Sequence, residues 1–383
     1  MCELIPNPRA AARPQWGADI VAPFLAKDIL PCHQSLPGYA PTPIVKLDSL
    51  AEELGIGSIC LKDESHRFGL KAFKSLGASY AIYRLLKECW ANETGEVFSP
   101  ELFHSRHYRD KLGEFTFCTA TDGNHGRAVA WTARLLGEKA VIYMPADSVP
   151  ARVEAIRSEG AQVVLVDGSY DDCVARAQRD ADANAWQVVS DTSYEGYTTI
   201  PRYIMAGYTA MFREIDNSLA PADRQFDHVL VQAGVGSLLA AAAWYYSANR
   251  QTRPTLVGVE PTAAACVAES VRNGKMQASQ GSLQTIMAGL NCGTVSKIAW
   301  PFIDSGVDAV ITLGDNHARQ AMYTLYHPHG ADPQVTSGES GAAGLAGLLA
   351  ARSQLGLTET SKVLLLSTEG DTDPENFRRV VDT

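Results

Sequence analysis

A lysine next to a phenylalanine, at the start of a predicted helix, is the first feature of this sequence that could do chemistry. Lys74 follows Phe73 in the run 69–78, after a predicted strand at 58–62, and the helix is expected to continue to about Cys89. A helix dipole disfavours positive charge at its amino end, and burial lowers a lysine pKa. Such a lysine suits Schiff-base chemistry, and a solvated surface lysine is the alternative.

Two predicted loops, each between a strand and a helix, could bind anions. Residues 119–126 read TATDGNHG and offer backbone N–H groups that suit a substrate carboxylate, unless Asp122 or Asn124 simply caps the helix. Residues 234–238 read GVGSL and follow a predicted strand at 228–232. Glycines let a backbone wrap closely around a phosphate, so this loop is a candidate phosphate site.

Other motifs compete with this interpretation. Glu260 ends the next predicted strand, as the ribose-binding acid of a dinucleotide site would, but Leu239 replaces the third glycine of that fingerprint. This argues against an NAD-dependent oxidoreductase. Residues 338–342 read GESGA instead of GxSxG, which argues against a serine hydrolase. Near the carboxyl end, the hydroxyl of Ser367 or Thr368 could hydrogen-bond a ring nitrogen of a bound ligand and leave that nitrogen neutral.

Composition excludes several classes of function. The chain has 383 residues, a formal charge of −10 and 46% hydrophobic residues. A negative chain lacks the clustered Lys and Arg that bind phosphate backbones, so no nucleic-acid partner is expected. The amino-terminal residues lack a secretory apolar stretch, and the longest apolar run, 229–246, is interrupted by polar residues and glycines. We therefore expect a cytoplasmic protein that does not enter a membrane.

Cysteine and histidine spacing predicts no metal site. The eight cysteines include no CxxC pair, and two close histidine pairs, at 104 and 107 and at 327 and 329, lack a third ligand nearby. Free thiols are expected in the cytosol. Cys266 and Cys292 are both expected near the cleft, and the sequence leaves open whether they pair.

Two sets of short apolar runs predict strands. The first set alternates with helices at 124–137, 150–160 and 170–185, and its strands are expected at 115–120, 140–145, 162–167 and 187–191. The second set lies on both sides of the first, at 43–47, 58–62, 228–232, 255–260, 309–313 and 362–366. The alternation predicts an α/β fold with mostly parallel sheets covered by helices.

The nesting of the two sets predicts the domain organisation. A large domain of residues 1–87 and 200–383 is expected to contain a small inserted α/β domain of residues 88–199. The cleft between two such domains is the default ligand site.

Four segments in this order resemble the tryptophan-synthase-β superfamily of pyridoxal phosphate (PLP) enzymes, fold type II. They are the Phe-Lys helix start, the loop 119–126, the glycine loop 234–238 and the turn 367–373. Within the superfamily the chain resembles the diaminopropionate ammonia-lyases over about residues 40–374. The resemblance implies two open, mostly parallel sheets, helices on both faces, and an active site in the interdomain cleft.

The resemblance also implies the cofactor site. Lys74 would carry pyridoxal 5'-phosphate as a Schiff base, Asn124 would hydrogen-bond its phenolic oxygen, and Phe73 would pack against its ring. Ser367, together with Thr368, would face the pyridine nitrogen and leave it neutral. The phosphate would be bound by the loop residues Gly234, Val235, Gly236, Ser237 and Leu238.

Two carboxylates would select the substrate. Dehydratases of the superfamily usually have a small residue where Asp122 stands, so its charge favours a β-ammonium group on the substrate. Asp191, at the end of a predicted strand, would converge on the same cleft, unless it caps a turn. The resemblance adds further substrate-binding residues, namely Thr121, Gly123, His125 and Tyr194, the last at a position where the family more often has tryptophan.

The implied reaction is α,β-elimination from 2,3-diaminopropionate. Loss of the α proton and the β-amino group gives aminoacrylate, which hydrolyses to pyruvate and a second ammonia. Lys74 and Asp122 are the candidate bases, and both D and L forms are candidate substrates if the two flank opposite faces of the α carbon. A serine/threonine dehydratase or a threonine-synthase-like enzyme is the alternative, and a non-catalytic binding module is disfavoured by the intact motifs. The family suggests a homodimer.

Overall fold

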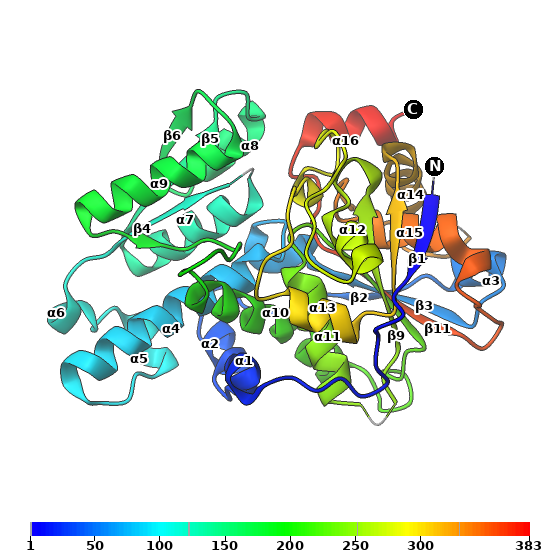
Figure 1. The fold of residues 1–383 in the computed structure, drawn as a ribbon, viewed down its shortest axis with the longest axis horizontal. Helices are drawn as coiled ribbons and strands as arrows, with labels where there is room; N and C mark the ends of the chain where they lie inside the picture. Colours follow the sequence, from blue (N-terminus) through cyan, green and yellow to red (C-terminus); the bar gives the residue numbers. More distant parts are fainter. Residues whose placement is uncertain (1, 122, 251, 329) are drawn as a thin grey trace. The chain divides into compact units, whose positions relative to one another are not determined.

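A computed structural model describes residues 2–121, 123–250, 252–328 and 330–383 (Figure 1). The chain forms two compact units. Unit 1 contains Met1–Val21, Pro41–Ala72 and Met211–Thr383, and unit 2 contains Ala22–Ala40 and Phe73–Ala210. The predicted domains, 1–87 with 200–383 and 88–199, divide the chain at other residues and stay a prediction.

Helix packing explains why unit 2 begins earlier in the chain than the predicted small domain. The helix α4 (Lys74–Thr94) packs on α7 (Asn124–Leu136) and on α2 (Ile29–Gln34). Twelve residues of α4 are buried, on more than one face of the helix. Sequence periodicity could not assign α4 to one unit, because an all-round buried helix has no single apolar face.

The sheet of unit 2 has four parallel strands in the order β6-β5-β4-β7. Helix α9 (Tyr170–Asn184) packs against Cys118, Val141 and Tyr143, whereas Gly126 of α7 lies against Ile142. Neighbouring strand residues point to opposite faces, so α7 and α9 cover opposite faces of the sheet (Figure 1). The strands are β4 (Thr116–Ala120), β5 (Lys139–Pro145), β6 (Gln162–Val166) and β7 (Gln187–Val188).

Strand β7 is shorter than the predicted strand at 187–191. The ladder continues for one more bond, from the Val189 amide to the Cys118 carbonyl at 2.8 Å, and then the chain leaves the sheet. Asp191 therefore lies beyond the carboxyl end of an edge strand, in a loop.

The sheet of unit 1 has seven strands in the order β1-β10-β9-β8-β11-β3-β2. The two edge strands, β1 and β2, are antiparallel to their neighbours, and the other pairs are parallel. Strand β1 was not predicted, because its sequence CELIP mixes charged, apolar and proline residues without a clear period. The strands are β1 (Cys2–Pro6), β2 (Ile44–Lys46), β3 (Ser58–Asp63), β8 (His228–Gln232), β9 (Thr255–Pro261), β10 (Ala309–Leu313) and β11 (Lys362–Ser367).

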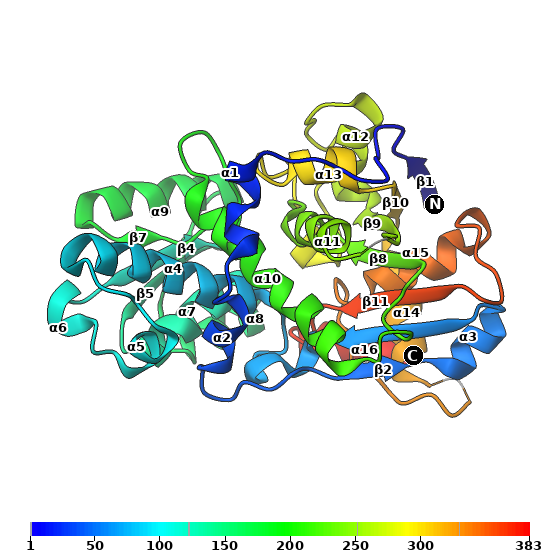
Figure 2. The same cartoon turned by 90° about the horizontal axis from the view of Figure 1, so that it is seen from below.

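Helices cover both faces of this sheet as well. On β9, Gly258 lies against Leu239 of α11 (Ser237–Ala248), and Val259 lies against Gly347 of α15 (Ala343–Ala351). Helix α11 contacts β8 and β9, and Figure 2 shows it beside these two strands. The predicted α/β class with mostly parallel sheets is confirmed.

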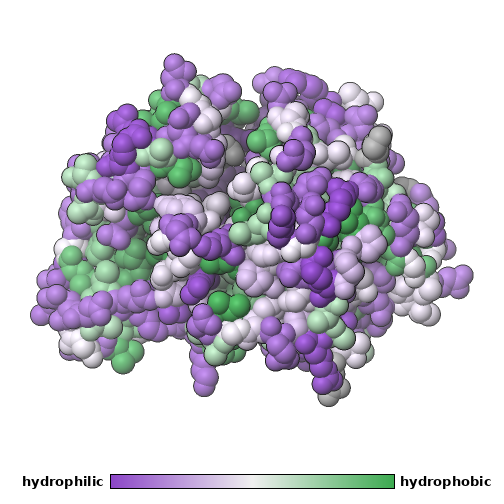
Figure 3. Space-filling model, viewed as in Figure 1, coloured by the Kyte–Doolittle hydropathy of each residue, from purple (hydrophilic) through white to green (hydrophobic). Residues whose placement is uncertain are grey.

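The remaining helices complete the two units. They are α1 (Ala18–Val21), α3 (Asp48–Leu54), α5 (Pro100–Ser105), α6 (Arg109–Leu112), α8 (Pro150–Arg157), α10 (Thr199–Ser218), α12 (Cys266–Asn273), α13 (Trp300–Gly306), α14 (Asp315–Tyr326) and α16 (Pro374–Val381). None of the helices in the described part of the chain has the length and hydropathy of a membrane span. Hydrophilic side chains cover much of the face shown in Figure 3, with hydrophobic ones interspersed.

Candidate active site

Lys74 is the first residue of α4, and a turn with unusual backbone geometry leads to it. Phe68, Gly69 and Lys71 have positive φ values of 50°, 71° and 57°. Residues with a side chain disfavour this conformation, and it persists only where the surroundings stabilise it, often at functional sites. The amide of Gly370 donates to the Lys71 carbonyl at 2.9 Å and fixes the end of the turn.

A fully buried network of charges lies just before this turn. Arg67 donates to Glu64 at 2.8 Å and to Glu214 of α10 at 2.7 Å, and Lys62 donates to Glu214 at 2.7 Å. Burial alone raises the pKa of Glu214, but Arg67 and Lys62 lower it to about 2. The two cations, Lys62 and Arg67, therefore balance the two carboxylates. Removal of any one of the four would leave a buried charge without a partner. The network ties the end of β3 to α10.

The Lys74 amine is paired with Asp191, a residue that the sequence placed in the site but not next to this lysine. Its Nζ lies 2.5 Å from Oδ2 of Asp191, and the side chains are 20% and 12% exposed. Burial alone raises the pKa of Asp191, but the charge of Lys74, the His125 ring and the hydrogen bond from Lys74 lower it well below its ordinary value. Asp191 is thus a carboxylate at neutral pH.

His125 adds a neutral ring to this pair. Its Nε2 lies 2.7 Å from the Val189 carbonyl, so this nitrogen carries the proton, and Nδ1 lies 3.9 Å from Oδ2 of Asp191. Burial lowers the pKa of His125. The charge of Asp191 opposes this effect, and the charge of Lys74 adds to it. Within the described residues Nδ1 has no hydrogen-bond partner. The predicted residues Lys74, Asp191 and His125 therefore form one cluster in unit 2.

Two aromatic rings lie beside Lys74, and only one was predicted. The Phe73 ring centroid is 5.5 Å from the Lys74 Nζ and 4.7 Å from the ring centroid of Tyr208. Tyr208 is completely buried on α10. It stands in no motif and far along the chain, so no signal in the sequence could have identified it.

The loop after β4 is stabilised from within. The Thr121 hydroxyl accepts hydrogen bonds from the amides of Gly123 at 3.0 Å and Gly126 at 3.1 Å. Gly123 has a φ of 154°, which favours glycine, and Asn124 begins α7. The Thr121 side chain, predicted to bind substrate, is used inside the loop. Asp122 lies outside the residues that the structure describes.

Tyr194 and Tyr197 form a stacked pair, with ring centroids 5.0 Å apart. The Tyr194 hydroxyl donates to Gln178 of α9 at 3.0 Å, so this predicted substrate residue has its hydroxyl engaged by α9. The Tyr197 hydroxyl accepts from the amide of Ser190 at 2.9 Å and donates to a carbonyl of β7. Tyr197, which sequence reasoning missed, thereby fixes the segment that leads to Asp191.

In unit 1, the loop 234–238 requires its glycines. Gly236 has a φ of 90°, and a Cβ there would stand 2.5 Å from Ile303. A Cβ at Gly234 would stand 2.9 Å from the sulfur of Cys292. Helix α11 begins at Ser237 and has 12 residues, so the loop presents backbone N–H groups at a helix start, where phosphates bind well.

The hydroxyls at the end of β11 are held by two residues that sequence reasoning missed. The Ser367 hydroxyl, completely buried, donates to the Ser337 hydroxyl at 2.8 Å. The Thr368 hydroxyl accepts from the Gln232 amide at 3.0 Å. Ser337 adjoins the segment that superficially resembles a hydrolase elbow, and in the fold that segment supports the end of β11.

Comparison with known proteins decides the family. Residues 36–369 match the family described as pyridoxal-phosphate dependent enzyme. The chain is 42% identical to the diaminopropionate ammonia-lyase of Escherichia coli strain K12, over 91% of this chain and 89% of that protein. It is 38% identical to the diaminopropionate ammonia-lyase of Salmonella typhimurium, over 100% of this chain and 98% of that protein. The chain belongs to the diaminopropionate ammonia-lyases.

A solved structure of the family agrees with this assignment. The crystal structure of the Escherichia coli diaminopropionate ammonia-lyase in complex with an aminoacrylate-PLP azomethine reaction intermediate is similar to this chain with a TM-score of 0.87. The two are 36% identical, and the match covers 100% of this chain and 97% of the other. The predicted family, the pyridoxal 5'-phosphate cofactor and the carbon–nitrogen lyase activity are confirmed.

The structure of this ammonia-lyase also removes the dinucleotide alternative. Glu260 is completely buried, and its carboxyl accepts the amides of Val267 at 2.9 Å and Ala268 at 2.7 Å. Burial raises its pKa to about 8. The residue that resembled a ribose-binding acid therefore caps helix α12.

Cys266 and Cys292, whose pairing the sequence left open, do not form a disulfide bond with each other in the structure of the lyase. The sulfur of Cys266 donates to Glu260 at 3.7 Å.

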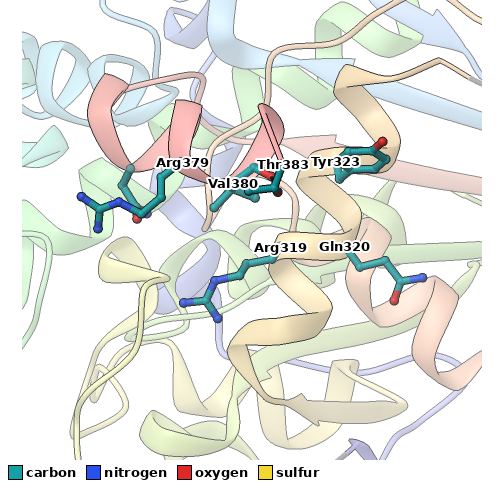
Figure 4. A pocket seen from close by; sticks show the side chains of 7 residues that line it. Arg319, Gln320, Tyr323, Arg379, Val380 and Thr383 are labelled. Carbon is teal, nitrogen blue, oxygen red and sulfur yellow. Dashed lines mark hydrogen bonds between the residues drawn. The ribbon is translucent and has the colours of Figure 1, made fainter.

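A surface hollow of about 480 Å³ lies elsewhere in unit 1 of the lyase, between α14 and α16 (Figure 4). Arg319, Tyr323 and Arg379 line it, together with residues that were not predicted to act. It contains none of the predicted site residues. The described residues also include no group of three or more metal-ligating side chains that could hold an ion.

Proposed function

We propose that Lys74 carries the cofactor of this enzyme and that the enzyme eliminates ammonia from 2,3-diaminopropionate, yielding pyruvate and two molecules of ammonia. The observation that supports this most is the 2.5 Å pair between the Lys74 amine and Asp191 at the start of α4. A lysine that reacts with an aldehyde must be held at a defined position and must be able to give up its proton. A buried carboxylate next to the amine holds the amine at one position, and the same attraction must be overcome when the amine gives up its proton.

We also propose which residues bind the other parts of the cofactor. Phe73 packs against the ring, Asn124 hydrogen-bonds the phenolic oxygen, and Ser367, with Thr368, meets the pyridine nitrogen. When bound, the cofactor withdraws electrons from the α carbon of an attached amino acid. The phosphate is assigned to the loop residues Gly234, Val235, Gly236, Ser237 and Leu238. Other atoms of the protein pack closely against the two glycines, and the loop leads into the start of a helix, where anions bind well.

The charges around Lys74 support a diamino-acid substrate. Asp191 pairs with the lysine amine, and the neutral His125 ring lies beside Asp191. Once that amine holds the cofactor, Asp191 loses a cationic partner, and the β-ammonium of diaminopropionate would replace it. We propose that Asp122 provides a second negative charge for the same group.

Further contacts to the substrate come from the loop after β4 and from the segment after β7. The proposed residues are Thr121, Gly123, His125 and Tyr194.

Proton transfer would use the lysine amine on one face of the α carbon and the Asp122 carboxylate on the other. General bases of this kind contribute about 10²–10⁴-fold. Two bases on opposite faces would let the enzyme accept both the D and the L form.

The test is a substrate comparison with the purified holoenzyme. Pyruvate release is measured from L- and D-diaminopropionate, and in parallel from serine, while 2-oxobutanoate release is measured from threonine. We expect diaminopropionate to be preferred over both hydroxy amino acids. Faster turnover of serine or threonine would contradict the proposal and indicate a dehydratase.

We also propose that the enzyme is a cytoplasmic homodimer. The family resemblance supports the dimer, and the negative charge and apolar pattern of the sequence support the compartment. Light scattering after size-exclusion chromatography should give about twice the chain mass of 41.3 kDa.

A further inference from the structure

The hydroxyl of Tyr208 is a buried polar group that the proposed mechanism does not use. Tyr208 is 0% exposed, and within the described residues its hydroxyl has no hydrogen-bond partner. A buried hydroxyl without a partner costs free energy, and native proteins rarely keep one without a reason. This group therefore needs an explanation.

Packing places the ring of Tyr208 on the first turn of α4. A Cβ at Gly77 would stand 2.5 Å from Cε1 of Tyr208 and 2.9 Å from Cζ, the carbon that bears the hydroxyl. A Cβ at Gly207 would likewise stand 2.4 Å from the Leu76 carbonyl oxygen. Helices α4 and α10 thus approach each other closely through two glycines, and any larger residue at Gly77 would displace the ring.

Gly77 and Lys74 lie on the same side of α4, because residues three apart in a helix are neighbours on its surface. The Phe73 ring contacts both groups: its centroid is 4.7 Å from the Tyr208 ring and 5.5 Å from the Lys74 Nζ. The Tyr208 hydroxyl and the Lys74 amine therefore lie in the same small space at the start of α4.

The charges around the hydroxyl keep it protonated. Burial raises the pKa of Tyr208 well above its ordinary value, Lys74 opposes this effect, and Asp191 adds to it. The hydroxyl is thus a neutral group at physiological pH that can both accept and donate one hydrogen bond.

We propose that Tyr208 is a positioning residue for Lys74, and that its hydroxyl hydrogen-bonds the lysine amine and, together with Asp191, directs it toward the cofactor aldehyde. The proposal rests on the proposed function of Lys74. In the reaction concerned, the lysine nitrogen bonds to the aldehyde carbon of pyridoxal phosphate and one water leaves. The hydroxyl suits this step because it can accept from the charged amine and donate to the neutral one, whereas the carboxylate of Asp191 can only accept.

The test is the variant Tyr208→Phe, which keeps the ring between Gly77 and Phe73 and removes only the oxygen. Apoenzyme is prepared from the wild type and the variant, and the rate at which each captures pyridoxal phosphate is followed by absorbance across a range of pH. Borohydride reduction and peptide mapping then identify the labelled lysine. We expect capture to slow by about tenfold or more, as the loss of one hydrogen bond to a charged group would cause.

Two further measurements separate positioning from stability. The thermal midpoint of Tyr208→Phe should stay close to that of the wild type, because the variant keeps the packing of the ring and removes only the hydroxyl oxygen. In the holoenzyme, kcat for diaminopropionate should fall while KM changes little. The matched control is Tyr246→Phe on α11, another buried tyrosine whose hydroxyl has no partner within the described residues and whose pKa does not depend on Lys74. It should capture the cofactor at the wild-type rate.

The outcomes distinguish this proposal from the proposed function. If Tyr208→Phe captures the cofactor at the wild-type rate and with the wild-type pH profile, or if it fails to fold, the positioning role is overturned. If the wild type captures the cofactor on Lys74 and the variant slows this step, but the wild type releases no pyruvate from diaminopropionate, the substrate assignment fails and the role of Tyr208 stands.

Discussion

The Oδ2 atom of Asp191 lies 2.5 Å from the Nζ atom of Lys74, although 117 residues separate the two in the chain. Asp191 lies beyond the last bond of an edge strand, and Lys74 begins a helix, so two different elements of unit 2 bring them together. The pair is almost buried, and its environment includes a neutral histidine and a neutral tyrosine. The contribution of this pair to the stability of the protein can be measured with single substitutions.

Replacement of Lys74 by alanine should abolish pyruvate formation, because Lys74 is the proposed site of the Schiff base. Borohydride reduction of the wild-type holoenzyme, followed by peptide mapping, should label Lys74. The neighbouring Lys71 is 45% exposed and paired with Asp371 at 2.7 Å, and Lys71→Ala is the matched control, which should keep the label. A label on Lys71 would show that the site had been assigned to the wrong lysine.

Asp191→Asn should destabilise the apoprotein at neutral pH by about 1.5–3 kcal/mol, the range for a hydrogen bond to a charged group. The pKa of Asp191 is lowered in the folded state, so its contribution is present above the unfolded carboxyl pKa of about 4 and is lost as pH falls through the lower folded value. Urea unfolding at pH 7 and at acidic pH measures this. Glu3→Gln, which breaks an exposed pair with Arg272, should change stability by less than about 1 kcal/mol. A difference from wild type that persisted unchanged at the lowest pH would argue against the ion pair.

Asp122→Asn keeps the size of the side chain and removes both its charge and its capacity as a base. Activity on D-diaminopropionate should fall by about 10²-fold or more. Elimination from the L form of β-chloroalanine, which has no β-ammonium, should fall less. Equal loss of both activities with an unchanged cofactor spectrum would leave Asp122 a helix cap only.

Glu214→Gln should destabilise the folded protein by about 3–5 kcal/mol, because Arg67 and Lys62 would lose their shared buried carboxylate. The wild-type contribution of Glu214 should disappear as pH falls from the ordinary carboxyl pKa of about 4.3 through its folded value of about 2. Chemical denaturation measures both effects. Glu375→Gln, which breaks an exposed pair with Arg379, should cost about 0.5 kcal/mol or less. Similar costs for the two variants would show that the buried network contributes no special stability.

Gly77→Ala should destabilise the protein by about 1–3 kcal/mol, since the new methyl group would stand 2.5 Å from the Tyr208 ring and 2.7 Å from Ile204. It should also lower cofactor capture by displacing Tyr208. Gly314→Ala is the matched control, because no atom outside its own neighbourhood lies within 4 Å of the added Cβ, and it should change stability by less than about 1 kcal/mol. A stable Gly77→Ala protein would mean that α4 and α10 can separate at this point at little cost.

Local patterns in the sequence were sufficient for the fold class, most of the strands, and the residues that begin helices. The phenylalanine and lysine at the start of α4, the glycine loop at the start of α11 and the serine at the end of β11 each stand at the end of an element, and such positions are set by neighbours within a few residues. The same locality identified the family, because its motifs are short and ordered along the chain.

Only the tertiary structure decided which side chains meet. Tyr208 contacts the start of α4 because Gly77 and Gly207 let two helices approach, and neither glycine signals this contact in the sequence. Glu260 resembled a ribose-binding acid by its position after a strand, yet it caps α12, because its environment is set by a helix that folds back over it. Contacts between distant segments depend on packing across elements, and packing leaves no periodic mark along the chain.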